Sequence, residues 1–205
     1  MSLHVVDHPL AKHLLTDLRN RDTQPLQFRR SAKILSTILM LEATRSLETS
    51  YSEIRTPLET HESEVLAHGI AVVPVLRAGL SMLEPALELF PDVAVGYIGL
   101  ERSHDTAIAS TYYKKLPDLS DRTVFCVDPM LATGGSGVQA VSFIKAAGAK
   151  KVVFVAVVSA PEGVEKMQKF HPDVEIFTAS LDRGLNDLKY ILPGLGDFGD
   201  RLFGT

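Results

Sequence analysis

Short runs of almost purely apolar, mostly β-branched residues recur along the chain, and segments with helical patterning separate them. Such runs are typical of strands buried on both faces, as in parallel sheets that helices cover. The intervening segments are long enough for crossover helices. The runs span 70–75, 93–98, 123–127, 152–158 and 174–178, and helices are expected over 80–90, 137–147 and 160–170. The pattern predicts an α/β fold with an open, mostly parallel sheet flanked by helices.

Three segments fall outside this alternation. Residues 1–60 are expected to form an N-terminal helical arm, with an amphipathic helix over 25–47. The polar segment 101–120 has no sustained apolar stripe, which predicts a long flexible loop or a protruding hairpin, and active-site lids often have this length. Residues 181–205 are rich in glycine but keep apolar side chains, so we expect them to fold over the sheet. The chain's length fits a single domain, 1–205.

Charge and cysteine content exclude several classes of protein. Lys and Arg total 21 against 25 Asp and Glu, a net charge of -4, so we expect no broad basic surface for nucleic acid. The single cysteine, Cys126, excludes an internal disulfide and a four-cysteine zinc site, and its place in a strand indicates a buried, inert thiol. We find neither a signal peptide nor an apolar run of about 20 residues. We therefore expect a soluble cytoplasmic protein with no membrane partner.

The turn after the third apolar run has the chemistry of a phosphate-binding loop. Asp128 follows the strand, and residues 133–137 form a Thr-Gly-Gly-Ser-Gly turn that opens a helix. Glycines let the backbone approach an anion, successive N–H groups converge on it, and a helix N-terminus carries partial positive charge. Asp128 is then placed to bond sugar hydroxyls. The alternative is a helix-capping turn whose glycines bind no ligand.

Two common nucleotide-binding motifs are absent from the sequence. A P-loop would carry a lysine directly after its glycines, and none follows here, which disfavours a kinase. A dinucleotide fold would carry Gly-x-Gly-x-x-Gly in an early strand-to-helix turn, which disfavours a dehydrogenase.

A second turn and the C-terminal segment add further candidates. Arg77 directly follows the first apolar run, where its guanidinium can bind phosphate oxygens, although arginines at helix starts are often only solvated. Glycines at 194, 196 and 199 indicate unusual backbone conformations, which suit a loop that reads a flat ligand with its own N–H and C=O groups. The alternative for this segment is a frayed tail.

These segments together resemble the uracil phosphoribosyltransferase family. The resemblance rests on Asp-Pro-Met-Leu-Ala-Thr-Gly-Gly-Ser at 128–136 and Pro-Gly-Leu-Gly-Asp-Phe-Gly-Asp-Arg at 193–201. It extends to 76–80, 160–163, 171–174 and 203–205, and so covers nearly the whole chain. It implies a type I phosphoribosyltransferase fold with a C-terminal base-binding hood. It also implies a glycosyltransferase (pentosyltransferase) of pyrimidine salvage, which joins uracil to 5-phosphoribosyl 1-diphosphate (PRPP) and releases UMP and diphosphate.

The resemblance also implies roles for individual residues. PRPP would be bound by Arg77, Arg102, Asp128, Pro129, Met130, Leu131, Ala132, Thr133, Gly134, Gly135, Ser136 and Asp197. Uracil would be read by Ile191, Gly196, Asp197 and Phe198. Asp197 and Arg102 are the catalytic candidates, and Mg²⁺ carried by PRPP would lie near Asp197. GTP is a candidate effector, and a homodimer or higher homo-oligomer is the implied assembly.

The chain departs from the wider superfamily at one position, and two alternatives stay open. Many phosphoribosyltransferases carry two adjacent acids at the strand end, whereas Pro129 takes the second place here, as in the uracil enzymes, so ribose binding rests more on Asp128. No residue is assigned as the base for the uracil N1 proton. His104 lies close to Arg102 in the segment 101–120, where a solvated loop histidine is favoured over a catalytic one. The alternatives are an RNA-binding pyrimidine regulator on the same fold and an enzyme that takes a purine or orotate.

Overall fold

A central sheet organises the protein in the computed structural model, which describes residues 3–90, 92–102 and 109–205. All neighbouring strands along the sheet are parallel except β6 and β7, which form an antiparallel hairpin. The short strands β5 (Ala94–Val95) and β9 (Met130–Leu131) lie beside β4 and β10. The order is β1 (Leu3–Val5), β11 (Glu175–Leu181), β10 (Lys151–Ser159), β8 (Arg122–Val127), β4 (Gly69–Leu76), β6 (Tyr97–Arg102), β7 (Ala109–Lys115). The open, mostly parallel sheet expected from the sequence is confirmed.

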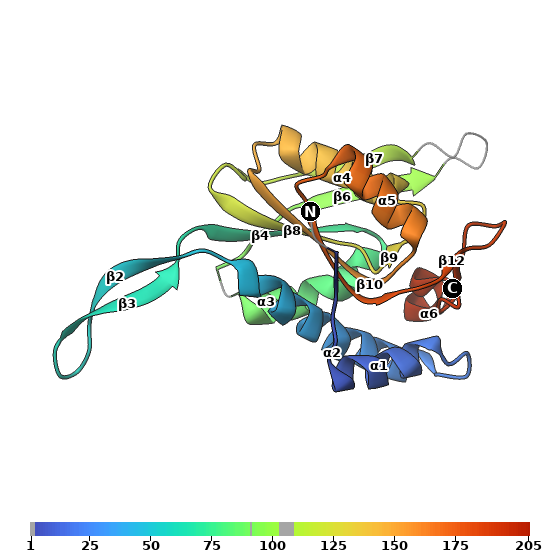
Figure 1. The fold of residues 1–205 in the computed structure, drawn as a ribbon, viewed down its shortest axis with the longest axis horizontal. Helices are drawn as coiled ribbons and strands as arrows, with labels where there is room; N and C mark the ends of the chain where they lie inside the picture. Colours follow the sequence, from blue (N-terminus) through green and yellow to red (C-terminus); the bar gives the residue numbers. More distant parts are fainter. Residues whose placement is uncertain (1–2, 91, 103–108) are drawn as a thin grey trace.

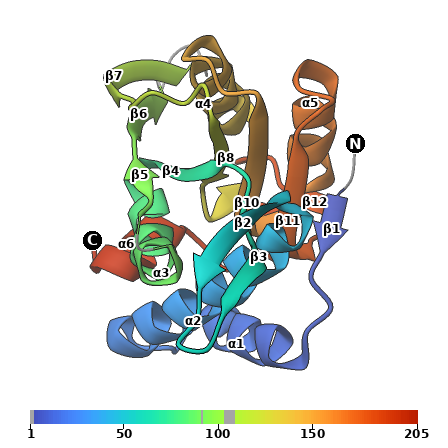
Figure 2. The same cartoon turned by 90° about the vertical axis from the view of Figure 1, so that its left-hand side faces the viewer.

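Helices cover both faces of the sheet, as Figures 1 and 2 show. Helices α4 (Gly135–Ala146) and α5 (Pro161–Phe170) lie on one face. The other face is covered by α1 (Pro9–Arg19), α2 (Pro25–Ala43) and α3 (Leu83–Leu89). No described helix is long and apolar enough to cross a membrane.

The two faces explain why the strand runs are apolar at nearly every position. In β10, Val153 and Val155 pack into the core beneath α1 and α2, while Val152 and Phe154 pack into the core beneath α4 and α5. A strand that buries both faces cannot alternate apolar and polar side chains. The continuous runs in the sequence are therefore the signature of the two-sided core.

The N-terminal helices form because their apolar residues recur at helical spacing. Helix α1 begins with proline in its first turn, after His8, whose side chain accepts a hydrogen bond from the N–H of Leu10 at 3.2 Å. Helix α2 ends at Ala43, earlier than the expected residue 47, and a 3-10 turn over Thr44–Ser46 follows. The Thr44 hydroxyl donates to the carbonyl of Leu41 at 2.7 Å, a local bond that competes with helix continuation.

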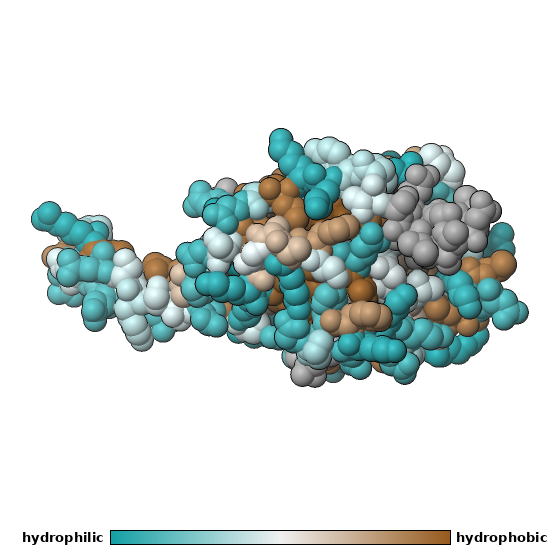
Figure 3. All heavy atoms as spheres, turned by 90° about the horizontal axis from the view of Figure 1, so that it is seen from above, coloured by the Kyte–Doolittle hydropathy of each residue, from teal (hydrophilic) through white to brown (hydrophobic). Residues whose placement is uncertain are grey.

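The expectation of a helical arm over 1–60 is wrong in its second part. Strands β2 (Thr49–Arg55) and β3 (Thr60–Leu66) form an antiparallel hairpin that projects from the body of the molecule (Figure 1). Nearly all of its residues are exposed, so no buried stripe marks the strands in the sequence. Apolar side chains are visible on this projecting hairpin in Figure 3. The exposed apolar residues of the hairpin are Tyr51, Ile54, Leu58, Val65 and Leu66.

The remaining differences concern where elements begin and break. The segment 101–120 contributes strand β7 to the sheet, which agrees with a hairpin rather than a loop throughout, and residues 103–108 lie outside the described residues. The helix expected over 80–90 is a 3-10 turn, Ala78–Met82, followed by α3. The C-terminal segment 181–205, which we call the hood, contains β12 (Gly184–Leu185), β13 (Ile191–Leu192) and α6 (Phe198–Phe203).

Candidate active site

The turn between β9 and α4 presents a row of backbone donors. Within the described part of the chain, the N–H groups of residues 133–137 donate to no protein acceptor. Gly134 is the N-cap of α4 and has a left-handed backbone, with φ 74°. The hydroxyls of Thr133 and Ser136 are partly exposed beside these N–H groups. The turn therefore has the donors, the glycine geometry and the helix N-terminus that an anion site needs.

Close packing against α5 explains two glycines near this turn. A Cβ on Gly134 would lie 2.8 Å from the carbonyl oxygen of Gly163, and a Cβ on Gly163 would lie 2.5 Å from that of Ala132. Both separations are shorter than real Cβ contacts allow. The Ala-Pro-Glu-Gly segment at 160–163 thus supports the turn from behind, and the side chain of Glu162 accepts a hydrogen bond from Leu185 N in the hood at 3.0 Å.

Asp128 is partly buried at the carboxyl end of β8. Its N–H donates to the carbonyl of Val155 at 3.2 Å, and its Oδ1 accepts a hydrogen bond from Met130 N at 3.3 Å. The following residue, Pro129, is buried, and its carbonyl accepts hydrogen bonds from the N–H groups of Val157 and Val158, each at 3.0 Å. These bonds fix the backbone on both sides of the carboxylate. The buried Pro129 and Leu131 can contribute to a site only through their backbones.

The turn that carries Arg77 lies directly against the end of β8. A Cβ on Gly79 would lie 2.6 Å from the carbonyl oxygen of Val127, the residue before Asp128, so only glycine allows this approach. Arg77 is exposed, and its guanidinium carbon lies 5.9 Å from the ring centre of Phe203 in α6. The Arg77 turn, the Asp128 strand end and the C-terminal hood thus meet at one edge of the sheet, which is where open α/β sheets bind ligands.

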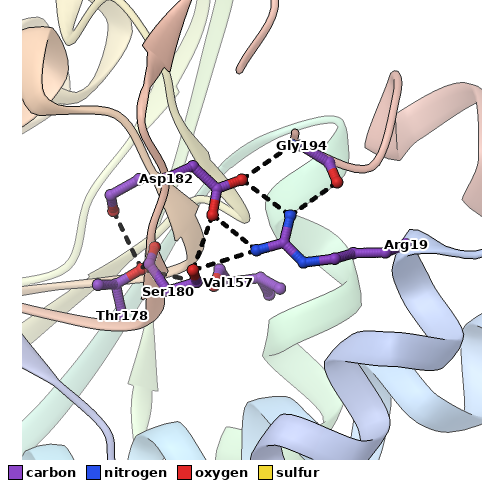
Figure 4. A network of polar contacts seen from close by, with 7 residues as sticks. Arg19, Val157, Thr178, Ser180, Asp182 and Gly194 are labelled. Atoms are coloured by element: carbon purple, nitrogen blue, oxygen red, sulfur yellow. Dashed lines mark hydrogen bonds and ion pairs between the residues drawn. The ribbon is translucent and has the colours of Figure 1, made fainter. Parts of the chain in front are cut away.

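The hood has an irregular backbone, and side chains from other elements hold part of it in place. Gly194 and Gly196 have positive φ, 58° and 81°. Both polar groups of the Gly194 backbone are engaged by side chains: its N–H by Asp182 and its C=O by Arg19, as Figure 4 shows. Gly196, by contrast, is exposed, and its N–H and C=O bond to no other described residue. This peptide is available to a ligand.

The hood residues predicted to read a base differ in what they can offer. Ile191 and Phe198 are 4% and 1% exposed, and the Phe198 ring packs edge-on against Phe28 with centroids 5.1 Å apart. Their side chains belong to the core, so only their backbones can face a ligand. Asp197 is exposed and caps α6, because its Oδ1 accepts a hydrogen bond from Asp200 N at 2.9 Å.

Two of the sequence candidates fall outside what the structure describes. Arg102 is the last residue of β6, and its side chain lies outside the description, as does the whole of His104. Cys126 is fully buried in β8, and burial, together with the nearby charge of Asp128, raises the pKa of its thiol far above the ordinary value. This environment suits an inert thiol rather than a nucleophile.

The metal-binding capacity of the site is limited. Among the described residues, no three His, Cys, Asp or Glu side chains gather where they could hold a metal ion. Asp128 and Asp197 provide carboxylate oxygens, which are ligands that Mg²⁺ prefers, but Mg²⁺ commonly keeps waters and substrate phosphates as its other ligands. The donor set therefore fits an ion that arrives on a diphosphate, and does not fit a cage made by the protein.

Sequence reasoning did not find Arg19 and assigned no role to Asp182 or Glu162, although it singled out the segments that contain them; in the structure all three hold the hood in place. Arg19 lies at the end of a helix that the sequence did not single out, and its partner is 163 residues away. No pattern within a single sequence connects two such distant positions. Asp182 directly follows β11, so its place at a strand end was the only available signal.

The comparisons with known proteins agree with this geometry. A family model described as uracil phosphoribosyltransferase matches residues 5–205. A uracil phosphoribosyltransferase of Dictyoglomus turgidum is 50% identical over 203 residues, covering 98% of each chain. A solved structure of an Aquifex aeolicus protein has a TM-score of 0.94 at 38% identity and covers 100% of this chain and 99% of its own. A hypoxanthine-guanine phosphoribosyltransferase of Bacillus anthracis, with a TM-score of 0.54, 12% identity and coverage of 77% and 80%, shares the fold.

Proposed function

The chain belongs to the uracil phosphoribosyltransferase family, and from this membership we propose that it joins uracil to PRPP, giving UMP and diphosphate. The type I phosphoribosyltransferase fold expected from the sequence is confirmed. In the reaction, N1 of uracil bonds to C1 of the ribose, the bond from C1 to the diphosphate oxygen breaks, and the N1 proton leaves. The observation that carries the proposal is the row of unbonded N–H groups at 133–137 beside Asp128 and below the glycine-rich hood.

We infer one orientation for PRPP, the phosphoribosyl donor, at this edge of the sheet. Its 5′-phosphate would accept hydrogen bonds from the N–H groups of 133–137, at the positive end of α4. Asp128 would bond the ribose hydroxyls, and Arg77 and Arg102 would bind the diphosphate. The close approach of the Arg77 turn to the end of β8 supports this placement, because Gly79 of that turn packs against Val127, the residue before Asp128.

Catalysis would follow from charge stabilisation at the breaking bond. Positive charge develops on the sugar and negative charge on the departing diphosphate, so fixed cations near the diphosphate stabilise the transition state more than the ground state. Mg²⁺ bound to the diphosphate would supply further positive charge at the leaving group, with Asp197 as the carboxylate nearest to it in our assignment. Asp128 would hold the ribose on the side where positive charge develops.

The base would be read mainly by backbone groups of the hood. Uracil presents an acceptor, a donor and an acceptor along one edge, and peptide groups can match this order. The exposed, unbonded peptide of Gly196 supports this assignment, and Ile191, Asp197 and Phe198 would add backbone contacts. Cytosine would leave buried partners unpaired, a mismatch that can discriminate by about 10⁴-fold.

The test is an activity assay of the purified protein with Mg²⁺ and PRPP. Uracil, cytosine, orotate and hypoxanthine are offered in parallel, each with and without GTP, and the products are separated by chromatography. UMP from uracil alone is the expected result, and activation by GTP would support the candidate effector. Turnover of a purine or orotate instead of uracil would overturn the proposed substrate.

The RNA-binding alternative receives no support from the comparisons, since the family model and the relative reported above are uracil phosphoribosyltransferases. The net charge of -4 also disfavours a broad RNA surface. A folded protein that binds PRPP but turns over no base would revive this alternative, and a filter-binding titration with RNA would then test it.

We also propose that the protein is a homodimer or higher homo-oligomer of the cytoplasm. Exposed apolar side chains on the projecting hairpin support the assembly, because such side chains on an extended element are typical of interfaces. The free, buried Cys126 suits a reducing compartment.

A further inference from the structure

Arg19 and Asp182 hold one peptide of the hood from both sides. The N–H of Gly194 donates to Oδ2 of Asp182 at 2.9 Å, and the C=O of Gly194 accepts a hydrogen bond from Nη1 of Arg19 at 2.8 Å. The two side chains also bond to each other, from Nη1 to Oδ2 at 2.8 Å and from Nη2 to Oδ1 at 2.6 Å. Figure 4 shows that this arrangement joins the end of α1, the segment after β11 and the hood. We name these three residues the Gly194 clamp.

The carboxylate of the clamp is buried, and both Nη atoms of its guanidinium are hydrogen-bonded. The side chain of Asp182 is 2% exposed and that of Arg19 is 24% exposed. Ser180 donates to Oδ1 of Asp182 at 2.7 Å and accepts from Nη2 of Arg19 at 3.1 Å. A planar guanidinium that faces a carboxylate in this way fixes orientation as well as distance. The position of the Gly194 peptide is therefore tied to rigid elements of the core.

A second arginine anchors the next residue of the hood to the same helix end. Arg201 donates from Nη1 to the carbonyl of Leu195 at 2.9 Å and to the carbonyl of Leu18, and from Nη2 to that of Asn20 at 2.6 Å. Its guanidinium carbon lies 4.5 Å from the ring centre of Phe28. Gly194 and Leu195 are therefore both tied by arginine side chains to the C-terminal end of α1. They directly precede Gly196, whose peptide is unbonded.

We propose that Arg19 and Asp182 are positioning residues that set the register in which the hood backbone meets the base, and so determine uracil affinity and selectivity. The inference rests on the proposed function. Neither residue needs to touch the substrate, because the clamp acts through Gly194. Backbone readout depends on geometry to within fractions of an ångström, so loosening a peptide two residues away degrades the match to uracil. Most of the proposed donor contacts come from β8, β9 and α4, and of the donor residues only Asp197 lies in the hood, so the clamp should affect base binding far more than donor binding.

The test measures base and donor separately in Asp182→Asn and Arg19→Lys. Asn keeps the shape of the side chain but turns an amide N–H₂ toward Arg19, and Lys keeps the charge but loses the two-pronged contact. We expect the KM for uracil to rise about tenfold or more and the preference for uracil over cytosine to fall by a similar factor. The Kd for Mg²⁺–PRPP, measured by calorimetry, should stay within about twofold.

Matched variants separate positioning from loss of folding. Asp173→Asn removes the ion pair with Lys145, which lies in the last turn of α4, at the end opposite the 133–137 turn, and should change neither the uracil KM nor the base preference. Ser180→Ala removes only the supporting hydroxyl, so it is the milder variant if Asp182→Asn does not fold, and we expect a smaller shift in the same direction. Circular dichroism confirms folding in each case.

The outcomes distinguish the two proposals. Folded Asp182→Asn, Arg19→Lys and Ser180→Ala proteins that keep the wild-type uracil KM and base preference would overturn the clamp. Equal losses for uracil and PRPP would also overturn it, because they would show a general structural role. A wild-type protein that makes no UMP from uracil would instead contradict the proposed function and leave the clamp without a base to position.

Discussion

Gly134 illustrates how a single residue serves both backbone geometry and packing. Its φ of 74° favours glycine, and a side chain there would meet the carbonyl oxygen of Gly163 at 2.8 Å. The neighbouring Gly135 has neither restriction, because a Cβ there would meet only the ends of the Lys166 and Thr133 side chains, each at 3.8 Å. Two adjacent glycines of one motif therefore have different physical justifications, which the sequence alone does not separate.

Gly134→Ala should weaken donor binding and destabilise the fold. A left-handed non-glycine residue costs about 1–3 kcal/mol, and the clash with Gly163 adds to it by pushing the turn away from α5. We expect a lower Tm and a KM for PRPP raised about tenfold or more, while the KM for uracil changes less. Gly135→Ala is the control and should keep most donor affinity. Equal behaviour of the two variants would contradict this account of the turn.

The pH dependence of stability offers a second test at the scale of one residue. Burial raises the pKa of Asp182, but hydrogen bonds from Arg19, Ser180 and Gly194 and the charge of Arg19 outweigh burial, so the net pKa lies below its ordinary value of 3.8. Asp182 therefore stabilises the fold above about pH 4, and this contribution is lost as the pH falls through the lowered pKa.

Urea unfolding of wild type and Asp182→Asn at several pH values measures this contribution. We expect the wild type to be clearly more stable at about pH 6 and the difference to shrink as the pH falls below about 4. Asp17 and Asp173, whose pKa values are also lowered, titrate in both proteins and cancel in the comparison. A difference in stability that is independent of pH would contradict the assigned charge state of Asp182.

At the scale of elements, the sequence predicts buried strands well and exposed strands poorly. The runs in β4, β8 and β10 were found because a strand buried on both faces leaves an uninterrupted apolar signal. The projecting hairpin was missed because its strands bury almost nothing, and its stability comes from main-chain pairing that any sequence of moderate β propensity can make. A strand without a buried face shows no alternation of apolar and polar residues, so the sequence gives no signal by which to detect it.

The projecting hairpin should mediate self-association without supporting the fold of the body. Ile54 and Val65 lie on one face of the hairpin, and each is 41% exposed. The double variant Ile54→Ser with Val65→Ser should lower the mass observed by sedimentation velocity and leave the Tm of the body within a few degrees. The double variant Ser50→Ala with Ser52→Ala on the same face is the control. An unchanged mass in the Ile54 and Val65 variant would exclude this face as an interface.

At the scale of the whole molecule, the candidate site was predictable where its residues follow strands directly. Asp128 and Arg77 were identified because the carboxyl ends of parallel strands meet at one edge. The position of the hood was predicted only as folding over the sheet. Its anchors come from α1 and from beyond β11, and no local pattern records a contact that spans 163 residues. Local signals predict the residues that we assign to the donor, and long-range contacts position the segment that we assign to the base.

Donor binding should stabilise the entire fold, because its proposed contacts come from several elements around the sheet. At about 100 times its Kd, Mg²⁺–PRPP should add about 2.7 kcal/mol, which is a rise in Tm of about 5–10 °C for a chain of this size. Differential scanning fluorimetry with and without EDTA measures the effect. Uracil alone should raise the Tm less than PRPP does. A full shift that survives EDTA would contradict a donor carried into the site with Mg²⁺.

The separation of Arg19 from Asp182 has a consequence for how the enzyme is made. The residues of α1 emerge from the ribosome early, whereas Asp182 and Gly194 are synthesised 163 and 175 residues after Arg19. The donor cradle, which β8, β9 and α4 build, emerges in between. On the proposed assignment, a nascent chain therefore contains the β8, β9 and α4 part of the donor site before it contains Asp182 and Gly194, and the segment that selects uracil is synthesised last.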